Sequence, residues 1–313
     1  MIGAPTGVGV DGLLTLMYHY VRPPDMTPAV VASNPVSPRR FEAQLELLTA
    51  ERTVVGWSAV AAALAGGPPL PGDACLLTFD DGLDDHHRVV LPILARRGLP
   101  AVFFIMARDA ADGLALGHRL HVLLAALGAD RLREAVLEGL EPDARARFAG
   151  AERERLEAGG WDDPLERLKH VLQRELAASV GPVLGRLIAE CVGPEDEIAE
   201  ALYLDGAQQA ELAAAGMTLG GHGREHHWLD FVAPSEVDAE LDASRRRLEA
   251  LGVADKAPFA YPYGGVPAGA ARVLPAHGFA AAFLARPSGG TDRFALGRVD
   301  AEDDSAFERA LRR

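Results

Sequence analysis

Short apolar runs alternate with segments of helical periodicity in two parts of the chain, before residue 108 and after residue 203. The apolar runs predict buried strands at 13–21, 75–79, 101–106, 217–221, 258–261, 279–285 and 294–299. Helical spacing predicts helices at 38–50, 58–65, 85–97, 208–215, 235–251, 268–277 and 306–312. This alternation predicts an α/β fold, a distorted (β/α)7-type barrel, with an open doubly wound sheet as the alternative.

The pattern changes between residues 108 and 203, where the chain is rich in Ala, Leu, Glu and Arg and carries almost no strand signal. A connection of this length is too long for a loop inside a compact domain. We therefore predict that 1–107 and 204–313 form the barrel and that 108–203 is a helical insertion, serving as a lid or an oligomerisation element. We interpret its histidines, His118, His121 and His170, as structural or solvated.

Two adjacent acids, Asp80 and Asp81, follow the apolar run at 75–79. A buried strand cannot hold exposed carboxylates along its length, so both acids are expected where the strand emerges. Gly82 allows the chain to turn there. In a barrel the carboxyl ends of all strands open on one face, and that face carries the chemistry. Taken alone, the pair is equally consistent with a helix cap beside a solvated acid.

A second strand end carries His222 and His226, which are four residues apart. If this segment begins a helical turn, both imidazoles face one metal ion, and His227 is the alternative second ligand. Two histidines and an aspartate leave coordination positions open for water and substrate, as a catalytic site requires. One acid of the Asp80–Asp81 pair would bind the ion and the other would take a proton from the attacking water, which predicts metal-assisted hydrolysis of an amide or ester.

Three motifs in this order, TFDDG, H-x-x-x-H and P-Y-G, resemble the polysaccharide deacetylase family, also called the NodB homology domain or carbohydrate esterase family 4. The MYHYV opening and the FEAQLELL helix resemble its poly-N-acetylglucosamine deacetylase branch. The resemblance covers about residues 13–107 and 204–300. It implies a distorted (β/α) barrel that removes N- or O-acetyl groups from sugars with a divalent metal, most often Zn²⁺, with Co²⁺ or Ni²⁺ as alternatives.

The resemblance assigns roles to the matching positions. Asp80 is the implied general base, and Asp81, His222 and His226 are the implied metal ligands.

The P-Y-G segment would line the substrate groove through Tyr261, Pro262 and Tyr263, and the Tyr263 N–H would stabilise the oxyanion. Trp228 and Leu229 would form an apolar wall for the acetyl methyl group, or would simply pack.

Two parts of the family pattern are absent. The usual Leu-x-His motif of the general acid has no clear copy, so His19, at the end of the first strand, is the preferred acid and His277 ranks below it. Many members carry an arginine that orients the base where this chain has Ala260. Arg298 or Arg224 would have to supply that charge.

The composition narrows the partners. A formal net charge of −14 argues against nucleic acid as a partner. No apolar stretch approaches the ~20 residues of a membrane span, and the N-terminus shows no signal peptide pattern, so we predict a cytoplasmic protein without membrane insertion.

A cytoplasmic location predicts a small acetylated sugar or glycan precursor, such as a nucleotide-linked or lipid-linked sugar, as the substrate. A homo-oligomer formed through the insertion is a further prediction. Two alternatives keep the fold: a metal-dependent C–N hydrolase acting on a cyclic imide, a ureide or another small N-acyl compound, and an inactive carbohydrate-binding homologue.

Overall fold

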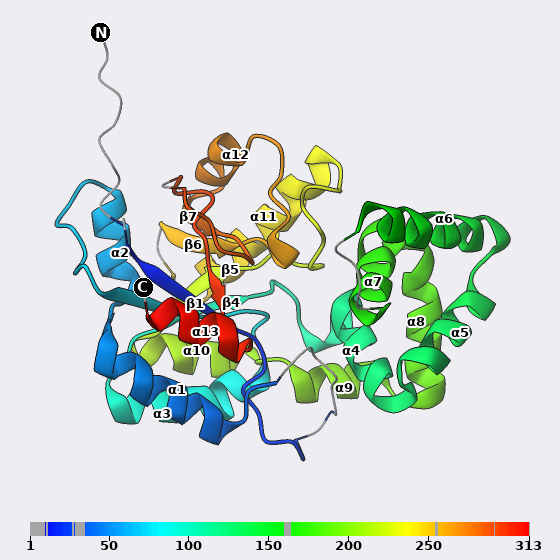
Figure 1. Cartoon of the computed structure of the whole chain (residues 1–313), viewed down its shortest axis with the longest axis horizontal. Helices are drawn as coiled ribbons and strands as arrows, with labels where there is room; N and C mark the ends of the chain where they lie inside the picture. The colour runs from blue at the N-terminus through cyan, green and yellow to red at the C-terminus, as the bar shows by residue number, and fades with distance from the viewer. Residues whose placement is uncertain are drawn as a thin grey trace, which may run out of the picture.

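A curled sheet of parallel strands is the centre of the molecule (Figure 1). The computed structural model describes residues 10, 12–26, 28, 35–159, 164–253, 256–290 and 292–312. Its strands are β1 Leu14–Tyr18, β2 Thr53–Val54, β3 Ala74–Phe79, β4 Val102–Ile105, β5 Thr218–Gly221, β6 Ala257–Ala260, β7 Phe279–Phe283 and β8 Val299–Asp300. The short β2 is not apparent in the apolar pattern, because neither of its two residues is buried.

The strand order is β7-β6-β5-β4-β3-β1-β8, with β2 also paired to β3. Every described pairing between these strands is parallel, and β3 and β4 are buried along their whole length. A parallel bridge between Phe283 and Leu296 joins β7 to the segment that leads into β8. The two edges of the sheet therefore approach each other, which confirms the predicted distorted (β/α)7-type barrel over the open doubly wound sheet.

Helices cover the outer surface of the sheet. They are α1 Pro38–Glu51, α2 Trp57–Leu64, α3 Leu91–Arg97, α10 Gly206–Ala214, α11 Pro234–Ala250, α12 Ala270–Ala276 and α13 Asp304–Leu311, with a π-helical turn at His86–Val90. The first begins as its sequence predicts, because the Ser37 side chain accepts a hydrogen bond from the Arg40 N–H at 3.2 Å. Its apolar stripe of Phe41, Leu45 and Leu48 is buried against the strands.

Between β4 and β5 the described chain is helical, and Figure 1 shows α4 to α8 gathered beside the barrel. The helices are α4 Leu116–Leu127, α5 Ala129–Gly139, α6 Pro142–Ala158, α7 Pro164–His170, α8 Ala177–Cys191 and α9 Glu195–Leu202, with turns at Ala110–Asp112 and Val171–Glu175. Their apolar side chains form a core distinct from that of the barrel, and among the described residues Tyr20, Leu83 and Met106 join it from barrel segments. Among the described helices, none has the length and apolar character needed to cross a membrane.

Candidate metal and active site

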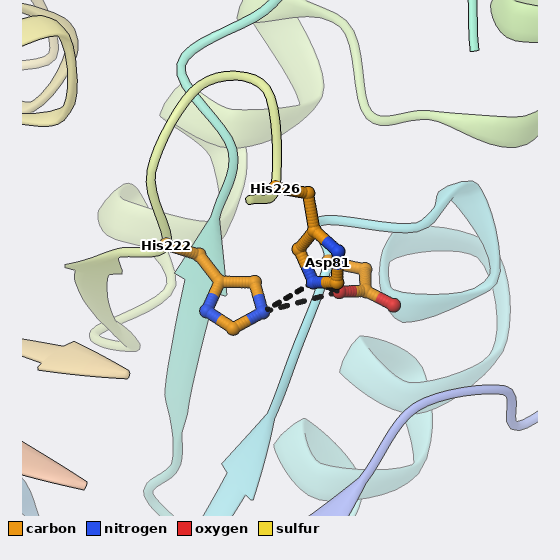
Figure 2. A group of neighbouring side chains, drawn as sticks. All are labelled: Asp81, His222 and His226. Atoms are coloured by element: carbon orange, nitrogen blue, oxygen red, sulfur yellow. Dashed lines mark hydrogen bonds and ion pairs between the residues drawn. The ribbon is translucent and has the colours of Figure 1, made fainter. Parts of the chain in front are cut away.

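Three donor atoms face one another where β3 and β5 end (Figure 2). Asp81 Oδ1 lies 3.2 Å from His222 Nε2 and 3.2 Å from His226 Nε2, and the two Nε2 atoms are 3.1 Å apart. Bonds of about 2.0–2.1 Å to one ion place neighbouring donors roughly 3.0–3.4 Å apart. The spacing of this donor triangle therefore fits a single divalent metal ion.

Unusual backbone conformations aim these donors. Four described non-glycine residues have positive φ angles, and three of them, Asp81 (77°), His226 (58°) and Tyr263 (56°), lie at this site. Such conformations are rare outside glycine and persist only where the surroundings enforce them. Three such residues at one site indicate that the surrounding structure maintains unfavourable backbone conformations there, and these conformations orient the side chains.

The segment with the histidines is a loop, so the expected helical turn is wrong. After His222 the chain turns at Gly223, with φ of 72°, and returns so that His226 meets His222 ring to ring. The carboxylate of Glu240, on α11, holds this loop by accepting hydrogen bonds from the Arg224 N–H at 2.6 Å and the Glu225 N–H at 3.1 Å. The i, i+4 spacing thus brings the rings together without a helix.

The protonation states of the donors suit a metal. Burial would raise the pKa of Asp81, but the nearby histidines hold it well below its usual range, so the carboxylate is ionised. Burial lowers the pKa of His226 to about 4, which leaves its imidazole neutral. His222 Nδ1 lies 2.8 Å from the Ala260 carbonyl oxygen, and a hydrogen bond donated there leaves the Nε2 lone pair free. Asp81 Oδ1 is buried without a hydrogen-bond partner, as an unbound ligand atom would be.

Asp80 lies beside the donor triangle and forms an ion pair with Arg298. The guanidinium donates two hydrogen bonds of 2.6 Å, Nη1 to Oδ1 and Nη2 to Oδ2. Arg298 is 1% exposed and also donates to the Leu284 carbonyl oxygen at 2.7 Å. Although burial acts to raise the pKa of Asp80, Arg298 and His222 lower it, so the carboxylate stays ionised.

His19 follows β1 and lies near Asp80. Its Nε2 lies 4.0 Å from Asp80 Oδ2, and its Nδ1 lies 3.5 Å from Glu302 Oε1. Burial acts to lower the pKa of His19, but the hydrogen bond to Glu302 and the nearby acids raise it to about 10. The Glu302 carboxylate also accepts the His19 backbone N–H at 2.8 Å, so this imidazolium is held in place.

The P-Y-G segment reaches the site through one side chain only. Tyr263 packs against His226 with ring centroids 4.4 Å apart, and stacks on Trp228 at 4.9 Å. Tyr261 was expected to line the substrate groove, but it is fully buried in the barrel core, and its hydroxyl donates to the Phe294 carbonyl oxygen at 2.8 Å. Pro262 is also buried. The prediction that Tyr261 and Pro262 contact substrate is therefore wrong, because both side chains are buried and neither lines the pocket at the strand ends.

The insertion forms one wall of the pocket at the strand ends, a cavity of about 300 Å³. All three histidines interpreted as structural or solvated line this pocket. His118 is 2% exposed and its Nε2 lies 3.1 Å from Asp81 Oδ2. His121 Nδ1 lies 3.1 Å from the Tyr20 hydroxyl, and His170 packs on Trp228 at 5.1 Å. The interpretation of these residues as structural or solvated did not place them at the pocket, which they line because α4 and α7 dock against the strand ends.

The alternative candidates for the second histidine ligand and for the general acid both lie away from the donor triangle. His227 Nδ1 is 4.0 Å from Glu240 rather than beside Asp81. His277 is on the surface, where it pairs with Asp238 and Asp242, so it is not placed to act as the acid.

Arg224 is exposed and pairs with Asp112, leaving Arg298 as the arginine that contacts Asp80. Leu229 is buried in the barrel core, so its role is packing.

Comparison with known proteins gives the family. The sequence profile described as polysaccharide deacetylase matches residues 67–142 and 161–282. The chain belongs to this family. No curated protein matches the chain.

Solved structures of other deacetylases share the fold. The Streptococcus pyogenes deacetylase PplD, in complex with acetate, is 17% identical with a TM-score of 0.59, covering 96% of each chain. IcaB from Ammonifex degensii is 20% identical with a TM-score of 0.56, covering 96% of this chain and 95% of that one. The BpsB deacetylase domain from Bordetella bronchiseptica is 16% identical with a TM-score of 0.52, covering 94% and 97%.

Three residues at the site of this polysaccharide deacetylase were missed from the sequence. Glu302 follows Arg298 by four residues in LGRVDAED, and an acid so close in sequence to the candidate arginine was a usable signal. His118 lies in LGHRLH, where two histidines three apart share a helix face. Glu240 had no signal, because a glutamate in the middle of a polar helix reads as solvated.

Proposed function

We propose that this polysaccharide deacetylase is a metal-dependent hydrolase that removes an N- or O-acetyl group from a sugar or glycan precursor. One observation carries the proposal: a triangle of one carboxylate and two imidazoles beside a second carboxylate that is held, ionised, by Arg298. A binding protein has no need for either feature. This is why we rank an inactive homologue below the enzyme.

Asp81, His222 and His226 would hold the ion, and their nitrogen and oxygen donors favour Zn²⁺, with Co²⁺ and Ni²⁺ as substitutes. A divalent ion here supplies a Lewis acid, which polarises the acyl carbonyl and makes water more acidic. A more acidic water is easier for Asp80 to deprotonate, and this matters because a carboxylate with a lowered pKa is a weak base on its own.

Asp80 takes a proton from the attacking water as the water oxygen bonds to the acyl carbon. The bond from that carbon to the sugar nitrogen then breaks, and His19 protonates the departing amine. Acetate and a free amine are the products, and the protons balance through Asp80 and His19. The positive charge that His19 carries beside Glu302 makes it suited to this donation. The Tyr263 N–H is the proposed donor to the oxyanion.

A cavity of about 300 Å³ is at the lower end of the usual size of ligand pockets, and the insertion closes one side of it. This supports a small acetylated sugar or glycan precursor over a long polymer. A second cavity of about 570 Å³ adjoins it at Gln173 and Trp228, and is placed to receive the part of the substrate beyond the acetylated ring. The cytoplasmic location and the homo-oligomer stay predictions.

The test is an acetate-release assay over nucleotide-linked sugars and short acetylated oligosaccharides, run before and after chelation of metal. We expect release from at least one substrate, loss on chelation, and recovery with Zn²⁺, Co²⁺ or Ni²⁺. Asp80→Asn should lower kcat by about a thousandfold and retain the metal. His277→Gln, on the surface, is the control and should leave kcat unchanged.

The same assay separates the alternatives. Ring opening of a cyclic imide without acetate release from any sugar would replace the proposal by the imide hydrolase. A protein that holds no metal and releases no acetate under any condition would leave only the inactive homologue.

A further inference from the structure

A chain of buried hydrogen bonds runs from the insertion to the donor triangle, and His118 is its last link before Asp81. The Tyr203 hydroxyl accepts the Ala115 N–H at 3.0 Å and lies 2.8 Å from His118 Nδ1. On the other side of the ring, His118 Nε2 lies 3.1 Å from Asp81 Oδ2. With the Tyr203 O–H donated to Nδ1, the imidazole keeps its proton on Nε2 and donates it to Asp81.

The two oxygens of Asp81 thus face different partners. Oδ1 faces the two histidines of the donor triangle, and Oδ2 faces His118. A carboxylate with one oxygen engaged in this way is fixed in rotation about its χ2 angle, so Oδ1 is presented to the metal position without further ordering. His118 is itself 2% exposed, so its hydrogen bond to Asp81 is largely shielded from solvent.

The end of the insertion is also fastened to the turn that follows Asp81. Leu204 donates its N–H to the Gly82 carbonyl oxygen at 2.9 Å, and Tyr203 forms an antiparallel bridge with Leu83. Tyr203 therefore sits on the barrel's own turn while its hydroxyl orients His118. Movement of the insertion away from the barrel would break both the turn contacts and the hydrogen bond to Asp81.

We propose that His118 is a positioning residue for the metal ligand Asp81, so that docking of the insertion sets the affinity of the site for its divalent ion. The inference rests on the proposed metal site, and it adds a function for 108–203 beyond that of a wall of the pocket. By linkage, a bound ion would in turn strengthen docking of the insertion.

The test measures metal affinity rather than turnover. The metal-free full chain is titrated with Co²⁺, followed by its visible absorption bands, and with Zn²⁺ in competition with a chelating dye. His118→Leu removes the donor at similar volume, and His118→Gln restores an amide N–H. Tyr203→Phe keeps His118 but removes the hydroxyl that orients it. His277→Gln is the matched control, because that histidine also bridges acids, Asp238 and Asp242, but on the surface.

We expect His118→Leu to weaken Co²⁺ and Zn²⁺ binding about 10–100-fold and to change the cobalt spectrum. His118→Gln should recover most of the affinity, Tyr203→Phe should lose a smaller part, and His277→Gln should match the wild type within twofold. Circular dichroism of each metal-free variant checks the fold, and Tyr203→Phe carries the test alone if His118→Leu does not fold.

Two results overturn the inference. One is unchanged affinity and spectrum in both His118→Leu and Tyr203→Phe, or in Tyr203→Phe when it alone folds. The other is a weakening in His118→Leu that His118→Gln does not relieve at all. The proposed function fails separately, if the wild type binds Co²⁺ tightly but releases no acetate. A wild type that binds no metal overturns both.

Discussion

Arg298 and Asp80 meet through two parallel hydrogen bonds of 2.6 Å although 218 positions separate them in the sequence. Arg298 comes from the segment before β8, at one end of the strand order, whereas Ala260, the position where the resemblance implies this arginine, lies in β6 near the other end. The barrel brings both segments to one strand end, so the same charge reaches the base from a different part of the chain. The vacant family position, Ala260, is buried in β6.

The first prediction follows from that geometry. In Arg298→Lys the charge remains but the planar, two-point contact is lost, so Asp80 is held less firmly. We expect kcat to fall about 10–100-fold with KM nearly unchanged, measured by acetate release. The pKa of Asp80 should rise, because its strongest charge partner is weakened, and the acidic limb of the pH–rate profile should move to higher pH.

Arg224→Lys is the control, since Arg224 is an exposed arginine that pairs with Asp112. Equal losses in both variants would show that Arg298 has no special relation to the base.

The second prediction concerns Glu302, whose hydrogen bond and charge, together with Asp81 and Asp80, raise the pKa of His19 to about 10 against the effect of burial. His19 acts in its protonated form, so activity is retained below that pKa and is lost as the pH rises through it. In Glu302→Gln the largest raising influence is removed, and although Asp81 and Asp80 still raise the pKa, burial lowers it, so the alkaline limb should move down by roughly one to three pH units. The pH dependence of kcat measures the shift.

Glu211→Gln removes a matched carboxylate from His87 at the surface, and its profile should follow the wild type. An alkaline limb that stays in place in Glu302→Gln would remove His19 from the role of acid.

The fold was predictable because apolar runs and helical spacing report burial directly. The strand ends followed from the same pattern, since Asp80 and His222 each come immediately after a buried strand. The loop that joins His222 to His226 was not predictable in its conformation. Spacing of four residues suggests a helix, and the positive φ of His226 is enforced by tertiary contacts that no local pattern encodes.

Other residues of the site could not be predicted, because their position depends on how the insertion packs against the barrel. His118 is on a helix whose buried face was evident, but nothing in the sequence states which surface that face meets. Tyr261 was predicted in the pocket but lies in the core. A side chain at a strand end points either to the pocket or to the core, and a shift of one residue decides which. The position of residues along the chain was therefore enough to predict where the site lies. The directions of their side chains could be determined only from the packed structure.

The third prediction tests the corrected position of Tyr261. Tyr261→Phe removes the hydroxyl that donates to Phe294, so the free energy of unfolding should fall by about 1 kcal/mol. Because the ring lies in the core, KM and kcat should stay within twofold of the wild type. Chemical denaturation and acetate release are the measurements. A rise in KM without loss of stability would return Tyr261 to the substrate groove.

The last prediction concerns the contact between the insertion and the P-Y-G segment. A Cβ at Gly117, on α4, would lie 2.6 Å from the Tyr263 hydroxyl oxygen. That hydroxyl is buried without a hydrogen-bond partner, and the ring is confined by His226 and Trp228. Gly117→Ala should therefore lower the free energy of unfolding by about 1–3 kcal/mol through overpacking, and kcat/KM should fall as Tyr263 is displaced.

Tyr263→Phe removes the atom that the new Cβ would meet, so the double variant should regain the stability lost in Gly117→Ala. Gly150→Ala, on α6, is the control, because a Cβ there meets nothing within 4 Å and alanine favours the helix. Thermal unfolding of the four proteins of the cycle gives the coupling between residues 117 and 263. Additive effects would mean that α4 does not rest on Tyr263, and the wall of the pocket would then be placed differently in solution.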